Sequence, residues 1–327
     1  MLALVATVAL ASFLPASGIA AQWLEVLTTV VVSLLFFLHG AKLSRAAIFA
    51  GIKHWRLHLA IFCATFVLFP VLGLLLRPVL TPLVTPDMYM GVLFLCCLPA
   101  TVQSAIAFTS IARGNIPAAV CSASASTLIG IVVTPILVGL LLNKHSADSN
   151  ALASIGKIAL QLLLPFVAGH LMRPLIQGFL SRHAKLVKVV DQGSILCVVY
   201  AAFSAAVISG LWQQTPLPAL AGLLLVCAIL LALVLCITTW SARRLGFSKE
   251  DEITLVFCGS KKSLLSGVPM ANVLFAASTV GAIVLPLMLF HQMQLMVCAV
   301  LAQRYARRNN ALSQQEAKTS EPEAAKG

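Results

Sequence analysis

The stretch VFCGSKKSLL, residues 256–265, places two adjacent lysines in the middle of a long apolar run that begins near Glu252. If this run crosses a membrane as a helix, Lys261 and Lys262 lie roughly 14 Å deep at about 1.5 Å per residue, near the midplane. A lysine at that depth costs about 2.5–3.5 kcal/mol when it faces lipid. We therefore expect a cavity or a partner group around them. The alternative is a locally thinned bilayer or a shifted helix boundary.

The composition around this stretch is that of a membrane protein. The chain has 327 residues, of which 60% are hydrophobic and 10% charged, and its mean hydropathy is +0.99. A soluble domain carries about 25% charged residues, so the composition excludes a soluble enzyme, a disordered chain and a secreted disulfide scaffold. The net charge of +12 does not indicate nucleic-acid binding, because the basic residues form short clusters between apolar runs. The nine cysteines also belong to those runs and are predicted to be packing residues.

Runs long enough for membrane helices predict the fold class. We expect an all-α polytopic membrane protein with about ten transmembrane helices, at roughly 1–14, 24–41, 58–77, 88–112, 116–142, 151–173, 190–211, 218–241, 252–276 and 279–303. Residues 1–21 have no basic start, so we interpret them as a first helix and not as a signal peptide. Residues 309–327 are polar and are predicted to form a disordered cytoplasmic tail.

The positions of lysine and arginine predict the orientation. Of the 22 basic residues, 17 fall in alternate loops and the tail, three (Arg77, Lys144 and Lys157) fall in the opposite loops, and the remaining two are Lys261 and Lys262. Basic loops stay in the cytoplasm. We therefore expect a multi-pass protein of the inner (plasma) membrane with both termini in the cytoplasm.

Two halves of the chain show a weak internal similarity. Five expected helices (1–146) precede the loop at 143–150, and five (151–308) follow it. VTPIL at 133–137 corresponds in position to VLPLM at 284–288. An odd number of spans in each half predicts two inverted five-helix repeats, the plan of many secondary transporters.

The fourth and ninth expected helices are each interrupted midway, at LPATVQS (98–104) and CGSKKS (258–263). Pro99 removes a backbone donor and disfavours helix at Leu98, and Gly259 supplies flexibility. Broken helices at matching positions of two halves indicate a transport site, because half-helix N-termini attract anions and freed carbonyls attract cations. A simple proline kink with polar packing residues is the alternative.

At these residues the chain resembles the bile acid:sodium symporter superfamily (solute carrier family 10), and most of all its "member 7-like" branch, which includes bacterial inner-membrane proteins. The resemblance covers about residues 1–308. Its most specific pieces are LHGAKLS (38–44), LPATVQSA (98–105), ARGN (112–115) and FCGSKKSL (257–264). It implies ten helices, with the fourth and ninth broken where they cross, and a core bundle that faces a panel of the first, second, sixth and seventh helices.

The resemblance also implies where sodium ligands would lie, and the sequence departs from that pattern. Cys258 stands where sodium-coupled members have Glu, and Lys262 and Ser263 stand for a Gln-Asn pair. Other expected ligand positions hold Ala105, Ile106, Ala119 and Ala123, unless a shift of one residue brings in a weak sodium site at Ser104, Ser122 and Ser124. We therefore expect sodium coupling to be weak or absent. A buried Lys262 ammonium would take the place of the ion, and a proton is the alternative coupling ion.

The residues thus predict a secondary active transporter of a small organic anion that works by alternating access. The predicted substrate and ion site comprises Thr101, Gln103, Ser104, Ser122, Ser260, Lys261, Lys262 and Ser263. The expected partners are the lipid bilayer and the anion, with no nucleic acid and no cofactor beyond a coupling ion.

Other functions fit the residues less well. The alternatives are a non-transporting membrane regulator of ion homeostasis and a drug/metabolite-type exporter. We expect no enzyme: no paired membrane aspartates, no nucleophile motif and no Walker A sequence occur. His39, His170 and His291 are interpreted as packing residues near helix ends, although a proton relay is an alternative.

Overall fold

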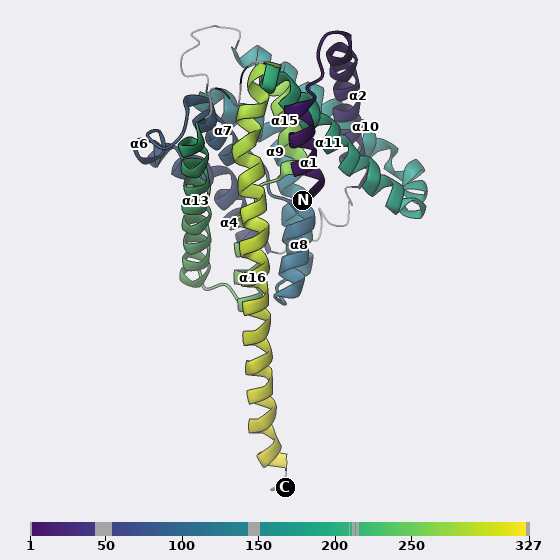
Figure 1. Ribbon diagram of the computed structural model, residues 1–327. Coiled ribbons are helices and arrows are strands. Elements are labelled where there is room, and N and C mark those ends of the chain that lie inside the picture. The colour runs from purple at the N-terminus through teal and green to yellow at the C-terminus, as the bar shows by residue number, and fades with distance from the viewer. Residues whose placement is uncertain are drawn as a thin grey trace.

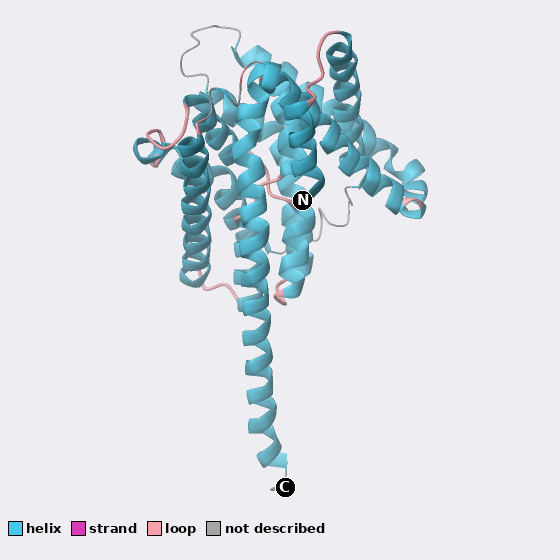
Figure 2. Cartoon of the chain, viewed as in Figure 1, coloured by secondary structure: helices cyan, strands magenta, loops and turns pink. Residues whose placement is uncertain are grey.

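The computed structural model describes residues 2–42, 54–142, 151–208 and 216–324, with residues 210 and 213 between the last two ranges. All elements of this part of the chain are helices (Figures 1 and 2). The expected loop at 143–150 between the two halves lies outside the described residues.

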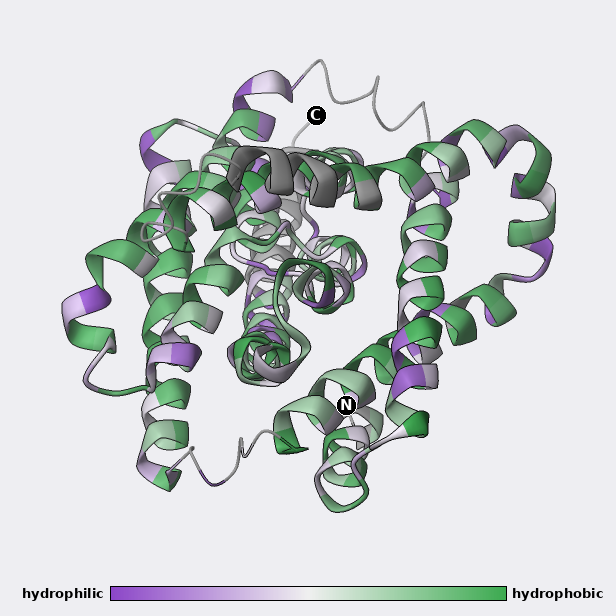
Figure 3. Cartoon of the chain, turned by 90° about the horizontal axis from the view of Figure 1, so that it is seen from above, coloured by the Kyte–Doolittle hydropathy of each residue, from purple (hydrophilic) through white to green (hydrophobic). Residues whose placement is uncertain are grey.

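The helices occupy the apolar runs found in the sequence. They are α1 (Leu2–Phe13), α2 (Ile19–Lys42), α4 (Trp55–Cys63), the π-helix η2 (Ala64–Leu68), α5 (Phe69–Leu75), α6 (Arg77–Leu80), α7 (Pro86–Cys97), α8 (Val102–Ile111), α9 (Ile116–Leu142), α10 (Ala151–Arg182), α11 (Ala184–Ile208), α13 (Leu217–Arg244), α14 (Lys249–Gly259), α15 (Leu264–Leu274) and α16 (Ala277–Ala324). Apolar residues cover most sides of these helices (Figure 3), which is typical of helices surrounded by lipid and by one another.

Seven helical segments of the described chain are long and apolar enough to cross a membrane, with α4, η2 and α5 counted as one, and the bent pair α7–α8 raises the number to eight. The all-helical membrane fold is therefore confirmed. The count of ten spans and the inverted repeat stay predictions, because α1 has 12 residues and α14 and α15 have 11 each, too few for each to cross about 30 Å of hydrocarbon alone.

The last helix, α16, extends beyond the expected tenth span at 279–303. It continues to Ala324 (Figure 1), and the disorder of residues 309–327 stays a prediction. Alanine, glutamine, glutamate and lysine are frequent there and are strong helix formers, so local propensity explains why the helix runs beyond the bundle.

Helices α2 and α10 pack with their backbones in direct contact, and α11 lies beside α2 (Figure 1). A Cβ atom on Gly40 of α2 would lie 1.9 Å from the Phe166 carbonyl oxygen of α10. In the same way, one on Gly169 of α10 would lie 1.9 Å from the Phe37 carbonyl oxygen of α2. Small residues allow this close approach between membrane helices. The reciprocal pair of glycines therefore fixes α2 and α10 as one unit.

Candidate functional site

Both predicted helix breaks are present, and they cross each other. The helix α7 ends at Cys97 and α8 begins at Val102 after a bend of 63°. The second break separates α14 from α15. The Ser263 amide donates to the Pro99 carbonyl at 3.0 Å, and Thr101 Oγ1 donates to the Lys262 carbonyl at 2.7 Å. The two breaks therefore form one hydrogen-bonded crossover.

The Lys262 ammonium lies on the side of the crossover where the half-helix α7 ends. It is fully buried, and its Nζ donates to the carbonyl oxygens of Thr65 (2.7 Å), Cys96 (2.8 Å) and Leu98 (2.8 Å). The Phe69 ring lies 4.1 Å from Nζ. Three carbonyls therefore satisfy the three N–H donors of the ammonium.

Local sequence explains why two of those carbonyls, of Cys96 and Thr65, are free. Cys96 lies in the last turn of α7, where carbonyls have no partner within the helix, and Pro99 supplies no N–H to this turn. Thr65 lies in the π-helix η2, where its carbonyl would accept from the residue five positions later, and that residue is Pro70. Pro99 and Pro70 therefore leave the carbonyls of Cys96 and Thr65 without a helical partner, so that these oxygens can bind a cation.

The backbone of Lys262 is held from α16. Gln294 Oε1 accepts from the Lys262 amide at 2.8 Å, and Gln294 Nε2 donates to its carbonyl at 2.9 Å. His291 Nδ1 lies 3.3 Å from the same carbonyl and 2.8 Å from Gln294 Nε2. The interpretation of His291 as a residue near a helix end is wrong, because it lies about fourteen residues into the span Ala277–Arg307. Sequence reasoning missed Gln294, although it belongs to the polar group HQMQ at 291–294 within an otherwise apolar run.

Lys261 has a different environment. It is also fully buried, but its Nζ has no hydrogen-bond partner among the described residues. It lies 4.1 Å from the Phe108 ring centroid and 5.6 Å from that of Phe257. Cation–π contacts of this kind replace part of the lost hydration.

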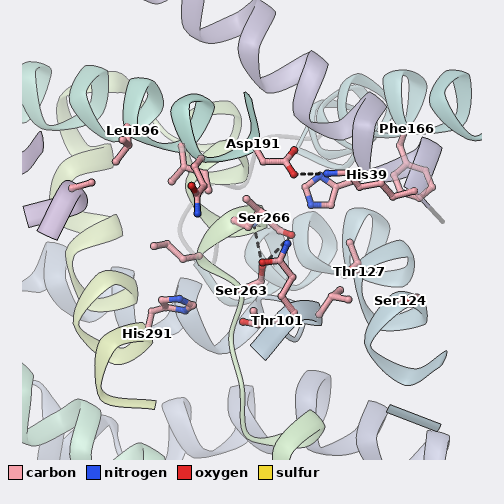
Figure 4. A pocket seen from close by; sticks show the side chains of 18 residues that line it. His39, Thr101, Ser124, Thr127, Phe166, Asp191, Leu196, Ser263, Ser266 and His291 are labelled. Carbon is pink, nitrogen blue, oxygen red and sulfur yellow. Dashed lines mark hydrogen bonds and ion pairs between the residues drawn. The ribbon is translucent and has the colours of Figure 1, made fainter. Parts of the chain in front are cut away.

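A cavity of about 560 Å³ lies beside the crossover (Figure 4). Among the predicted site residues, Thr101, Gln103 and Ser263 line it, and Ser124 of the weaker sodium alternative does so too. The N-terminal residues Val102 of α8 and Leu264 of α15 also line the cavity. The N-terminal ends of two half-helices therefore border the cavity, and Ser263 Oγ caps the Ser266 amide of α15 at 3.2 Å.

The other predicted site residues lie elsewhere. Lys261 and Lys262 are not in the lining of this cavity. Ser260 Oγ donates to the Val256 carbonyl within α14, Ser122 Oγ is 2.6 Å from His58 Nδ1, and Ser104 Oγ is buried without a partner in the described part of the chain. The lining does include two residues that sequence reasoning did not place in the site, the ion-paired Lys42 and Asp191.

A second cavity, of about 650 Å³, lies toward the other ends of the same helices. It is lined by Glu25 and Thr28 from the N-terminal half of α2, and by Ser204 from the C-terminal half of α11. His39 and Asp191, from the opposite halves of α2 and α11, line the first cavity. The two cavities therefore lie at opposite ends of one helix pair.

A helical membrane bundle with two broken helices crossing beside a cavity has the architecture of a secondary transporter. Residues 1–307 match the model of the SBF-like CPA transporter family, and the chain belongs to this family. The resemblance to bile acid:sodium symporters is thereby confirmed, and the protein is a multi-pass membrane protein of a transporter family, not of an enzyme family.

Individual relatives are similar along most of the chain. An uncharacterized protein of Pseudomonas aeruginosa is 65% identical over 94% of this chain and 93% of its own length. The Escherichia coli protein YfeH, named as a candidate symporter, is 57% identical over 96% of this chain and 95% of its own length. The sodium/bile acid cotransporter 7 of Rattus norvegicus is 29% identical over 83% of this chain and 81% of its own length.

Proposed function

We propose that the protein is a secondary active transporter of a small organic anion. The observation that carries this proposal is the charge arrangement at the crossover. The N-termini of α8 and α15 face the cavity of about 560 Å³, and each carries about half a positive charge. The Lys262 ammonium offsets the negative C-terminal end of α7, through Cys96 and Leu98. Positive potential therefore faces the cavity, and an anion fits it best.

We further propose that Lys262 replaces the coupling sodium ion of the family's bile acid symporters. Carbonyl oxygens are suitable sodium ligands, but three of them are already bound to an ammonium. The position expected for an acidic ligand holds Cys258, which is buried. Without a mobile cation in the site, the remaining coupling ion is a proton.

Two cavities at opposite ends of α2 and α11 support alternating access. The tight α2–α10 contact makes these helices a fixed frame against which the crossover moves. The distribution of basic residues supports a location in the inner membrane with both termini in the cytoplasm.

Flux into proteoliposomes tests this function. Purified protein is reconstituted, and currents or radiolabel uptake are recorded for a panel of anions: hexanoate, adipate, taurocholate and sulfate, with choline as the only external cation. Saturable flux of at least one organic anion is expected, and empty liposomes are the control. Absence of flux for the whole panel, in either direction and with or without a pH gradient, would contradict the proposal.

A further inference from the structure

The wall of the cavity opposite the crossover carries an ion pair. Lys42, the last residue of α2, donates from Nζ to Asp191 Oδ2 of α11. Both side chains line the cavity, and Asp191 lies across it from Ser263 and Thr101 (Figure 4). A ligand between these walls would contact the crossover on one side and the ion pair on the other.

The ion pair retains unused hydrogen-bonding capacity. Asp191 is 5% exposed, and its second oxygen, Oδ1, has no hydrogen-bond partner among the described residues. The Lys42 side chain is 39% exposed, and its ammonium has more donors than the one that Asp191 accepts. A buried acceptor without a partner is costly. A ligand group that both donates to Asp191 and accepts from Lys42 would remove that cost.

The charges around the cavity limit the charge of the ligand. Lys42 and Asp191 neutralise each other, and Lys262 offsets the C-terminal end of α7. The N-termini of α8 and α15 remain, and together they amount to about one positive charge. One acid group balances them. A second full charge at the far end of the ligand would lie against the Lys42–Asp191 pair, which carries no net charge to balance it.

We propose that Lys42 and Asp191 select for a neutral hydroxyl at the far end of a monoanionic substrate. The carboxylate lies at the N-termini of α8 and α15, and the hydroxyl donates to the Asp191 carboxylate and accepts from Lys42. This inference rests on the proposed function, because it names the substrate class of the same cavity. The ligand class is a hydroxy acid, in preference to a plain acid, a dicarboxylate or an amino acid.

Calorimetric titration of the purified full-length protein tests the selection. The probes are straight-chain acids with a terminal methyl, hydroxyl, carboxylate or ammonium group, each with four, six and eight carbons so that several spans are sampled. In the wild type, the best hydroxy acid is expected to bind about tenfold more tightly than the plain acid of equal length, since it gains hydrogen bonds to charged groups.

Two variants change the net charge of the Lys42–Asp191 pair in opposite directions. Asp191→Asn leaves Lys42 without its counter-charge, so the dicarboxylate becomes the preferred probe. Lys42→Gln leaves Asp191 as an uncompensated anion, so the amino acid becomes the preferred probe. Asp87→Asn, which removes an acid from the first turn of α7 outside the cavity lining, is the matched control and keeps the wild-type order.

The selection is overturned if the hydroxyl gives no advantage in the wild type, if the order of probes is the same in both charge variants, or if no probe of the series binds. These results are separable from failure of the proposed function. Flux of other anions in proteoliposomes without binding of this series removes the selection alone, whereas absence of all flux removes the transport proposal.

Discussion

Gln294 makes hydrogen bonds to both backbone groups of Lys262, accepting from its amide at 2.8 Å and donating to its carbonyl at 2.9 Å. A carboxamide on α16 thus replaces the helical partners that Lys262 loses at the break between α14 and α15. The ammonium on the same residue holds the other broken helix. One residue therefore joins three separate elements.

Replacing Gln294 tests this connection. Gln294→Leu removes two buried hydrogen bonds and leaves an amide and a carbonyl without that partner, so we expect the free energy of unfolding to fall by about 2 kcal/mol. Gln303→Leu on the exposed surface of the same helix should change it by less than about 0.5 kcal/mol. Thermal unfolding of both variants in detergent provides the comparison, and equal effects would refute the role of Gln294.

The two lysines should differ in their importance for transport. Lys262→Gln loses the contacts to three carbonyls, so we expect flux at neutral pH to be lost. Folding and membrane insertion should be retained, because removal of a buried charge offsets lost hydrogen bonds. Lys261→Gln changes a side chain whose Nζ has no hydrogen-bond partner among the described residues, so it should retain most of the flux. Proteoliposome flux and gel filtration of each variant measure the difference. Normal flux in Lys262→Gln would show that the transport site lies elsewhere in the protein.

Sodium should have little effect on the wild type. The oxygen ligands at the crossover are bound to Lys262, so replacing choline with sodium should not shift the melting temperature. In Lys262→Ser the three carbonyls are vacated and a hydroxyl is added, so we expect a saturable, sodium-specific stabilisation in that variant. Potassium is the control ion. A sodium-specific shift in the wild type would show that a competent sodium site is present.

Chemical labelling tests the orientation. Ser17 and Ser248 are exposed residues in the loops before α2 and before α14. In a background without the exposed Cys63 and Cys236, Ser248→Cys should react with an impermeant maleimide only from the cytoplasmic side, and Ser17→Cys only from outside. Reaction of both from the same side would contradict the expected topology.

Much of the fold could be predicted from the sequence because its signals are local. Apolar runs gave most helix ends to within a few residues. The larger differences are the starts of α2 and α11, at Ile19 and Ala184, and the ends of α10 and α16, at Arg182 and Ala324. The break at Pro99 was predictable because proline removes a donor at a known position. The crossing of the two breaks followed from the family resemblance, whereas their positions along the chain indicated only that both lie near the midplane.

The cavity could not be predicted in the same way, because its charged wall depends on long-range packing. Lys42 and Asp191 are 149 residues apart, and each stands near one end of its own apolar run, where a charge usually faces water. Ser122 and Ser124 are two positions apart on α9 and therefore point in different directions. Only Ser124 reaches the cavity, whereas Ser122 meets His58.

The position of the Lys262 ammonium has a consequence for the direction of transport. Under the proposed function, a cation that is covalently part of the chain is not released on the far side of the membrane, so each cycle would move the substrate anion without a compensating sodium ion. Against a membrane potential of about 100 mV, negative inside, inward movement of one negative charge costs about 2.3 kcal/mol, which is an equilibrium ratio of roughly fifty in favour of the outside. If no proton accompanies the anion, the membrane potential drives the substrate out of the cell, because the cation stays with the protein.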